Sequence, residues 1–246
     1  MADSKTAETR STGTKTRSPV RRAARRSKLA AGDIAEIFRR FEAANPVPKG
    51  ELSYTTPFTL LVAVVLSAQA TDLGVNKATA KLFPLADSPQ KALALGEARL
   101  TDLIKSIGLY RSKARNLIGL AEKLIADYGG EVPRQREALE SLPGVGRKTA
   151  NVVLNTAFGE PVIAVDTHLF RVANRTGLAP GRNPLEVELG LARAIPDRYK
   201  LHAHHWLILH GRYVCKARRP ECPECLIADL CRYPDKTVRP DAESPL

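Results

Sequence analysis

Residues 142–150, which read Leu-Pro-Gly-Val-Gly-Arg-Lys-Thr-Ala, place a reactive amine beside a tight turn. Gly144 and Gly146 let the backbone turn sharply and come close to another molecule. Backbone amides exposed there, at the mouth of a helix, suit a phosphate oxygen. Lys148 follows just inside the second flanking helix, where its amine could act as a nucleophile or simply contact the phosphate. The pattern therefore indicates a site that handles DNA or RNA.

The four cysteines form a second candidate site. Cys215, Cys222, Cys225 and Cys231 fall within 17 residues and are spaced C-x6-C-x2-C-x5-C. Disulfides are poorly suited to an intracellular chain, whereas clustered thiolates are typical of a metal centre. Zinc sites usually show two C-x2-C pairs and here there is one, and a four-thiolate iron–sulfur cluster fits as well. The spacing therefore leaves zinc and iron–sulfur open.

Three basic residues, Lys216, Arg218 and Arg219, lie between the first two cysteines. If both ends of this loop were bound to a metal, the three cations would be held at one place on the surface, where they could contact phosphates. The alternative is a metal site with a purely structural role, beside which the surface charges have no function.

The histidines also invite a metal interpretation. They are His168, His202, His204, His205 and His210. On a helix, the adjacent pair His204 and His205 would point about 100° apart. We therefore expect structural or phosphate-contact roles for the histidines in place of metal ligation.

The elements that position these residues are all predicted to be helices. Asp33 is a plausible N-cap for the first helix, and Thr56 with Pro57 starts a second, almost wholly apolar one that runs to about residue 68. Gly129 and Gly130 close a long helix. Further helices are expected at about 72–83, 89–95, 97–106, 111–127, 134–141, 147–157, 166–175, 185–194 and 203–212. Alternating strand patterns are nearly absent, so the fold class is all-α.

Composition places most of the unusual charge at the N-terminus. The chain of 246 residues has a net charge of +12, and residues 1–31 hold nine basic residues against two acidic ones. We expect these 31 residues to be a disordered arm that binds polyanions, a solvated tail or, least favoured, a transit peptide. Residues 236–246 are expected to fray.

No apolar run approaches the length of a spanning helix, and no signal-peptide core follows the start, so we expect a soluble, intracellular chain.

Several segments together resemble the helix–hairpin–helix DNA base-excision glycosylases, and the endonuclease III family in particular. Residues 142–148 resemble the family's hairpin. Asp166 lies 18 residues after Lys148, as the family's catalytic aspartate does, and the cysteine spacing is similar to that of the iron–sulfur members. Segments 66–72, 107–110 and 204–211 also resemble this family. The likeness covers roughly residues 30–235.

The resemblance implies a bilobed all-α fold. One lobe, 50–160, would be a six-helix barrel that ends with the hairpin, and the other would combine 32–49 with 161–235. The resemblance also implies a [4Fe-4S] cluster on the four cysteines. It implies a monomeric, cytoplasmic, nucleoid-associated bacterial enzyme that acts on double-stranded DNA with damaged bases or abasic sites.

The implied activity is a bifunctional DNA glycosylase and AP lyase for oxidised pyrimidines. Lys148 would form a Schiff base and Asp166 would stabilise the sugar cation, although Asp166 also reads as a helix N-cap. Gln69 and Leu109 would fill the hole left by the flipped base, and Asp72 would line the base pocket. Ordinary core packing is the alternative for Leu109.

The remaining DNA contacts would come from Gly144, Val145 and Gly146 in the hairpin and from the cysteine loop. Two other readings stay open. One is the adenine-mismatch glycosylase branch, which typically lacks the hairpin lysine and carries a further C-terminal domain. The other is a DNA-binding module without catalysis that holds a structural metal.

Overall fold

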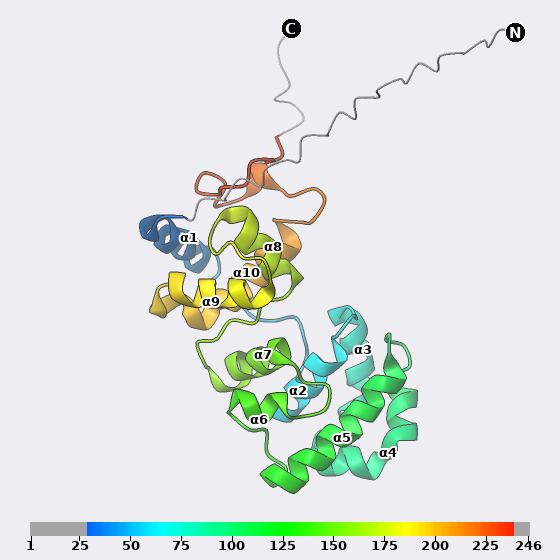
Figure 1. Cartoon of the computed structure of the whole chain (residues 1–246). Helices are drawn as coiled ribbons and strands as arrows, with labels where there is room; N and C mark the ends of the chain where they lie inside the picture. Colours follow the sequence, from blue (N-terminus) through cyan, green and yellow to red (C-terminus); the bar gives the residue numbers. More distant parts are fainter. Residues whose placement is uncertain (1–28, 239–246) are drawn as a thin grey trace, which may run out of the picture.

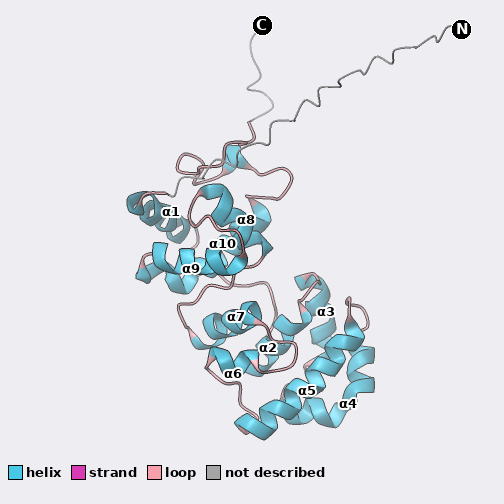
Figure 2. Ribbon diagram, in the orientation of Figure 1, coloured by secondary structure: helices cyan, strands magenta, loops and turns pink. Residues whose placement is uncertain are grey.

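The computed structural model describes residues 29–238 as a set of helices joined by short loops, with no strand in that range (Figures 1 and 2). The expected all-α class is confirmed. The helices are α1 Ala31–Ala44, α2 Pro57–Leu66, α3 Asp72–Leu82, α4 Pro89–Ile104, α5 Tyr110–Tyr128, α6 Arg136–Glu140, α7 Arg147–Phe158, α8 Thr167–Thr176, α9 Pro184–Ala194 and α10 Asp197–Tyr213, followed by a short 3-10 turn at Cys222–Glu224.

The central helix α2 starts where its sequence predicts. The Thr56 hydroxyl accepts a hydrogen bond from the Thr59 amide at 3.1 Å, and the Thr59 hydroxyl accepts one from the Thr56 amide at 2.8 Å. This reciprocal cap satisfies amides that a helix start leaves unpaired, and Pro57 supplies a preset φ angle. Every residue of α2 after Pro57 is buried, so the helix lies in the interior.

The N-terminal boundary differs from the prediction. Helix α1 begins at Ala31, so Asp33 is not its N-cap; instead Asp33 forms an ion pair with Arg232 at 3.4 Å. Leu29, assigned above to the disordered arm, is buried and its amide donates to the Gly177 carbonyl at 3.2 Å. Burial of Leu29 against distant helices extends the ordered chain beyond the local signal. The arm's residues 1–28 and the last residues, 239–246, lie outside the described residues.

Helix α10 also starts earlier than expected, at Asp197 in place of about residue 203. Tyr199, in its first turn, is buried and stacks on Phe38 of α1 with ring centroids 5.8 Å apart. Tertiary packing therefore adds a turn and a half that the local pattern left out. The two helices expected at 89–95 and 97–106 are the two parts of α4, interrupted at Gly96, whose φ is +78°.

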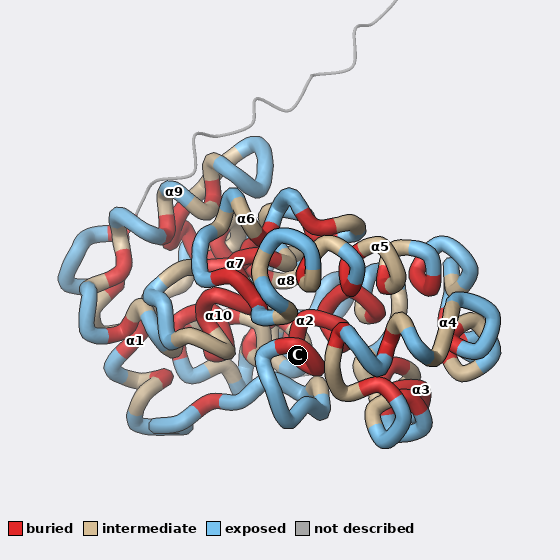
Figure 3. Tube along the Cα trace, turned by 90° about the horizontal axis from the view of Figure 1, so that it is seen from below, coloured by how far each residue is buried: buried red, intermediate tan, exposed pale blue. Residues whose placement is uncertain are grey.

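Two hydrophobic cores organise the described residues (Figures 1 and 3). The first is built by α2 to α7 around buried side chains such as Leu61, Leu66 and Leu120. The second is built by α1, α8, α9 and α10 around Ile37, Phe38 and Leu169. Since α1 precedes the first core and α8 follows it, the second core joins segments that are far apart in the sequence.

Polar contacts tie the two groups of helices together. The Asn155 side-chain amide on α7 donates to the Leu201 carbonyl on α10 at 3.0 Å. The Asn151 amide donates to the Ile163 carbonyl at 3.1 Å. These bonds run from α7 to the chain segments that follow it. None of the described helices has both the length and the apolar character needed to cross a bilayer.

Candidate active site and metal centre

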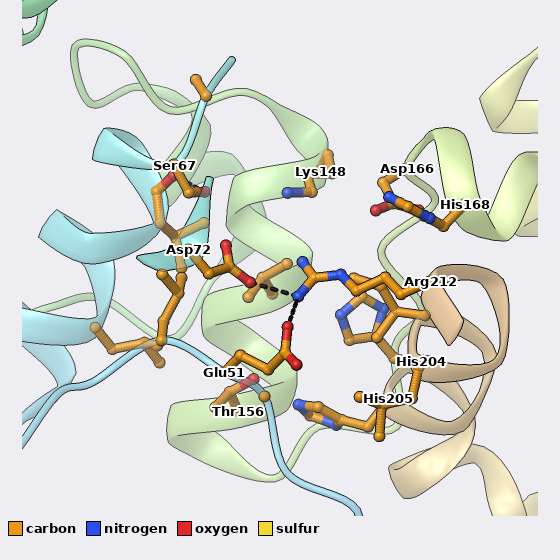
Figure 4. A pocket seen from close by; sticks show the side chains of 18 of the residues that line it. Glu51, Ser67, Asp72, Lys148, Thr156, Asp166, His168, His204, His205 and Arg212 are labelled. Atoms are coloured by element: carbon orange, nitrogen blue, oxygen red, sulfur yellow. Dashed lines mark hydrogen bonds and ion pairs between the residues drawn. The ribbon is translucent and has the colours of Figure 1, made fainter. Parts of the chain in front are cut away.

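A cavity of about 400 Å³ lies where the two groups of helices meet (Figure 4). Its walls come from the α2–α3 loop, from α7, from the start of α8 and from α10. Lys148 and Asp166 both line it, on opposite sides in Figure 4. The volume falls in the range typical of small-molecule sites, so a single nucleotide base could enter it.

The glycine turn presents Lys148 on the first turn of α7. Gly144 has φ +79°, a backbone conformation that favours glycine. A Cβ at this position would also lie only 2.9 Å from the Asn116 side chain. Val145 is buried beneath the turn, whereas Gly146 stays exposed at the N-cap of α7. Lys148 is exposed and has no hydrogen-bond or ion-pair partner among residues 29–238. Its amine is therefore available to a ligand in the cavity.

Asp166 occupies the N-cap of α8. One carboxylate oxygen, Oδ1, accepts a hydrogen bond from the Leu169 amide at 2.8 Å. The capping bond holds the side chain in place and leaves the second oxygen beside the cavity. The structural and the chemical reading of Asp166 are therefore compatible.

Gln69 and Leu109 are the two non-glycine residues with positive φ in the described chain, at +54° and +59°. Their loops are adjacent, since a Cβ on Gly108 would lie 3.7 Å from the Gln69 carbonyl oxygen. Leu109 is 58% exposed, so core packing is wrong for this side chain. Left-handed backbone at such residues costs free energy, and strain of this kind gathers at functional sites.

Arg212 is a residue of this cavity that the sequence reasoning missed. Its guanidinium donates to Asp72 at 2.5 Å and also contacts Glu51, as the dashed lines of Figure 4 show. Asp72, expected to line a base pocket, does line the cavity but is paired with Arg212. A signal was present, because His204, Ile208 and Arg212 follow one face of α10 at intervals of four.

Histidines contribute to the same walls. His204, His205 and His168 line the cavity, and Nδ1 of His204 is buried without a hydrogen-bond partner. Burial lowers the pKa of His204 to about 3 and also lowers the pKa of His205. Both imidazoles are therefore neutral at pH 7.

All four cysteines are free thiols and line one narrow second cavity with Thr176, among others. Burial raises the pKa of Cys225 to about 11 and also raises that of Cys231, so thiolates here need positive charge nearby. Within residues 29–238, no group of three or more possible ligands is arranged to hold a single metal ion. The four sulfurs line one space, and four cysteine thiolates are the usual ligand set of an iron–sulfur cluster.

The cysteine loop, taken here as residues 215–231, is anchored to two helices. Arg175, near the end of α8, donates to the carbonyls of Lys216 and Ala217 at 2.6 and 2.7 Å. From α1, Arg40 binds both carboxylate oxygens of Asp229 at 2.7 and 2.9 Å.

The three loop cations are not equivalent. Lys216 forms an ion pair with Glu221 at 2.8 Å. Arg218 and Arg219 are exposed and have no partner within residues 29–238. The two arginines are therefore the loop cations left free for phosphates.

Comparison with known proteins identifies the family. Residues 62–197 match the HhH-GPD superfamily of base excision DNA repair proteins, and residues 215–231 match the iron–sulfur binding domain of endonuclease III. The chain is 59% identical to endonuclease III of Haemophilus influenzae over 201 residues, which is 82% of this chain and 95% of that protein. It is 58% identical to endonuclease III of Escherichia coli with the same coverage. The chain belongs to the endonuclease III family.

Solved structures of endonuclease III agree with this assignment. A trapped endonuclease III–DNA covalent intermediate matches with a TM-score of 0.78 and 48% identity, over 83% of this chain and 96% of that one. A non-covalent endonuclease III–DNA complex matches equally well. This member of the endonuclease III family is thus a DNA-binding base-excision repair enzyme, a DNA glycosylase and AP lyase. Its cofactor is a [4Fe-4S] cluster.

Proposed function

We propose that Lys148 is the nucleophile that excises oxidised pyrimidines from double-stranded DNA, and that Asp166 assists it. The observation that carries this proposal is an unpaired lysine amine and a fixed carboxylate facing one cavity large enough for a flipped base (Figure 4). The trapped covalent DNA complex of the 48% identical endonuclease III supports a covalent route. Preference for oxidised pyrimidines follows from the family resemblance.

The reaction begins with a flipped nucleotide, because a stacked base cannot reach the cavity. Neutral Lys148 attacks C1′, the C1′–N bond breaks, and its electron pair leaves with the base, which takes up a proton. Asp166 stabilises the cation-like sugar and accepts a proton from the amine. The C1′–O4′ bond then breaks, O4′ leaves with the electron pair and takes up the proton held by Asp166, and an iminium ion remains on Lys148. Loss of a proton from C2′ expels the 3′ phosphate and cuts the strand.

The DNA contacts are proposed on three surfaces. The exposed amides around Gly144, Val145 and Gly146 take the backbone phosphates. Gln69 and Leu109, on their adjacent strained loops, fill the hole in the base stack. Arg218 and Arg219 contact phosphates from the cysteine loop, beside Lys216, which is paired with Glu221, and Asp72 with its partner Arg212 borders the base.

We assign the cluster to Cys215, Cys222, Cys225 and Cys231, which line one cavity. When bound, the cluster cross-links four points of the loop and fixes its shape. The chain's own residues then hold that loop on α8 and α1 through Arg175 and Arg40.

Domain boundaries and assembly complete the proposal. We assign residues 50–160 to the barrel lobe and 32–49 with 161–235 to the cluster lobe, and the two hydrophobic cores support this division. One chain supplies every residue named above, which supports a monomer. The net charge of +12 supports association with the nucleoid.

The test is borohydride trapping on duplexes that hold an abasic site, an oxidised pyrimidine or adenine opposite an oxidised guanine. We expect adducts on the first two with the native protein and none with Lys148→Ala, while Lys91→Ala, a change at an exposed lysine in the first turn of α4, traps normally. Excision of adenine without an adduct would instead support the adenine-mismatch branch. Trapping by Lys148→Ala would show that another amine is the nucleophile.

A further inference from the structure

One ion pair joins the residue next to Lys148 to the other group of helices. Arg147, the first residue of α7, donates from Nε to both carboxylate oxygens of Glu188 at 3.2 and 3.0 Å, and from Nη2 to Oε1 at 2.7 Å. Glu188 lies on α9, 41 residues along the chain, and only 12% of its side chain is exposed. The Arg147 side chain is 40% exposed, but the carboxylate that accepts its hydrogen bonds is mostly buried, and a two-pronged pair of this kind is among the stronger polar contacts in proteins.

Asn151 and Asn155 hold the later turns of α7 to the second group of helices, and Arg147 does so at the first turn. The N-cap of α7, Gly146, makes no side-chain capping bond. Helix α7 packs on α2 and α6 of the first core, whereas α9 packs on α8 of the second. Asp166 is the N-cap of α8. The Arg147–Glu188 pair therefore connects the helix turn that carries Lys148 to the helices that hold Asp166.

The local surroundings place this pair directly behind the reacting groups. Arg147, Lys148 and Glu188 line one small cavity together with Val165, the residue before Asp166. In Figure 1, α7 and α9 face each other across the junction of the two helix groups. A shift of the α7 start would thus move the Lys148 amine relative to Asp166.

We propose that Glu188 is a positioning residue, which acts through Arg147 to set the distance between the Lys148 amine and the Asp166 carboxylate. This inference rests on the proposed function of Lys148. The alternative is that Arg147 contacts a DNA phosphate, and that Glu188 only pairs with Arg147 when DNA is absent. The two differ in outcome: positioning alters the chemical step, whereas a phosphate contact alters affinity.

The experiment compares Glu188→Gln, Arg147→Gln and the double variant with Glu186→Gln. Glu186 serves as the matched control because it lies on the same helix, but its partner, Arg182, is only four residues away, just before the start of α9. Binding to an uncleavable abasic duplex gives Kd, and single-turnover trapping at saturating protein gives the rate of the chemical step. Thermal unfolding shows whether each variant is folded.

We expect Glu188→Gln to slow the chemical step by about 10- to 100-fold, with Kd within about threefold of native, since small misplacements of reacting groups cost this much. The double variant should be no slower than the slower single one, because the pair acts as a unit. A chemical step in Glu188→Gln within twofold of Glu186→Gln would overturn the proposal. So would a change confined to Kd, or rate losses that simply multiply. If native protein forms no adduct, the proposed function fails; if only the Glu188 effect is absent, this inference alone fails.

Discussion

At the residue scale, Asp166 caps a helix and, in the proposed mechanism, also stabilises the sugar cation. Its Oδ1 satisfies the Leu169 amide, and the cap keeps the carboxylate at the cavity wall. An amide oxygen caps a helix about as well as a carboxylate but carries no charge to stabilise a cation. The two functions can therefore be separated by one substitution.

We predict that Asp166→Asn leaves the free energy of unfolding within about 1 kcal/mol of native but slows base excision by about 100-fold or more. Denaturant unfolding and single-turnover excision check the two halves. Asp166→Ala is the control, since it should lose about 1 kcal/mol of stability as well as activity. Normal excision by Asp166→Asn would remove Asp166 from the mechanism.

Leu109 shows strain retained at an exposed position. The residue is 58% exposed, so burial of its side chain contributes little free energy to offset the cost of the left-handed backbone. Glycine adopts the same φ without that cost.

We predict that Leu109→Gly keeps or raises stability, by up to about 1 kcal/mol, while excision from duplex DNA falls. Abasic sites need less unstacking, so their cleavage should fall less. Leu85→Ala, at another exposed leucine, is the control and should change neither quantity. A Leu109→Gly protein that is destabilised yet fully active would contradict the wedge role.

At the element scale, α8 connects the two sites. It begins at its cap, Asp166, and ends beside Arg175, which holds the carbonyls of the cysteine loop. A helix of this length is a rigid rod of about 15 Å. The cysteine loop and the Asp166 carboxylate therefore keep a fixed spacing, which supports the proposal that the loop sets where the DNA backbone lies relative to the cavity.

Replacing Lys216, Arg218 and Arg219 together by alanine should weaken DNA binding and make its salt dependence shallower. Each phosphate contact contributes about 0.9 to the slope of log K against log salt. Because Lys216 is paired with Glu221, we expect the slope to fall by about 2, from the two arginines. The same measurement on Lys91→Ala/Lys123→Ala, at two surface lysines that pair with Asp87 and Asp127, should give the native slope. An unchanged slope in the triple variant would place the loop away from DNA.

At the scale of the whole molecule, the junction of the two helix groups contains buried neutral histidine. His204 has a pKa of about 3, well below its ordinary 6.5, because burial disfavours the cation. Between these two values the unfolded chain binds a proton that the folded chain does not. The free energy of unfolding therefore rises with pH across this window. The contribution of neutral His204 to stability is fully present above about pH 6.5.

The unfolding free energy of the native protein should rise between about pH 4 and pH 7. We predict that this rise is about 3 kcal/mol smaller in His204→Gln. Urea unfolding at four or five pH values measures this. His202→Gln, at a half-buried histidine on the same helix, should keep the native slope. A native slope in His204→Gln would mean that other groups control acid unfolding.

The amino-acid sequence alone predicted most helices and the residues proposed here as the reacting groups. The glycine turn around Lys148, the cap at Thr56 and the break at Gly96 depend on residues within a few positions of one another. Such local interactions can be read directly from the chain, because capping, turn geometry and helix periodicity need no distant partner. The cysteine spacing indicated a metal centre in the same way, although it left the metal open.

Only the tertiary structure decided which distant residues meet. Arg212 reaches Asp72 across 140 positions, Arg147 reaches Glu188 across 41, and Leu29 is buried against helices that follow much later. Nothing near these residues specifies their partners, because an arginine or a leucine is compatible with many surfaces. Packing of the two cores selects among those surfaces, and it also holds Leu109 in a backbone conformation that its own side chain disfavours.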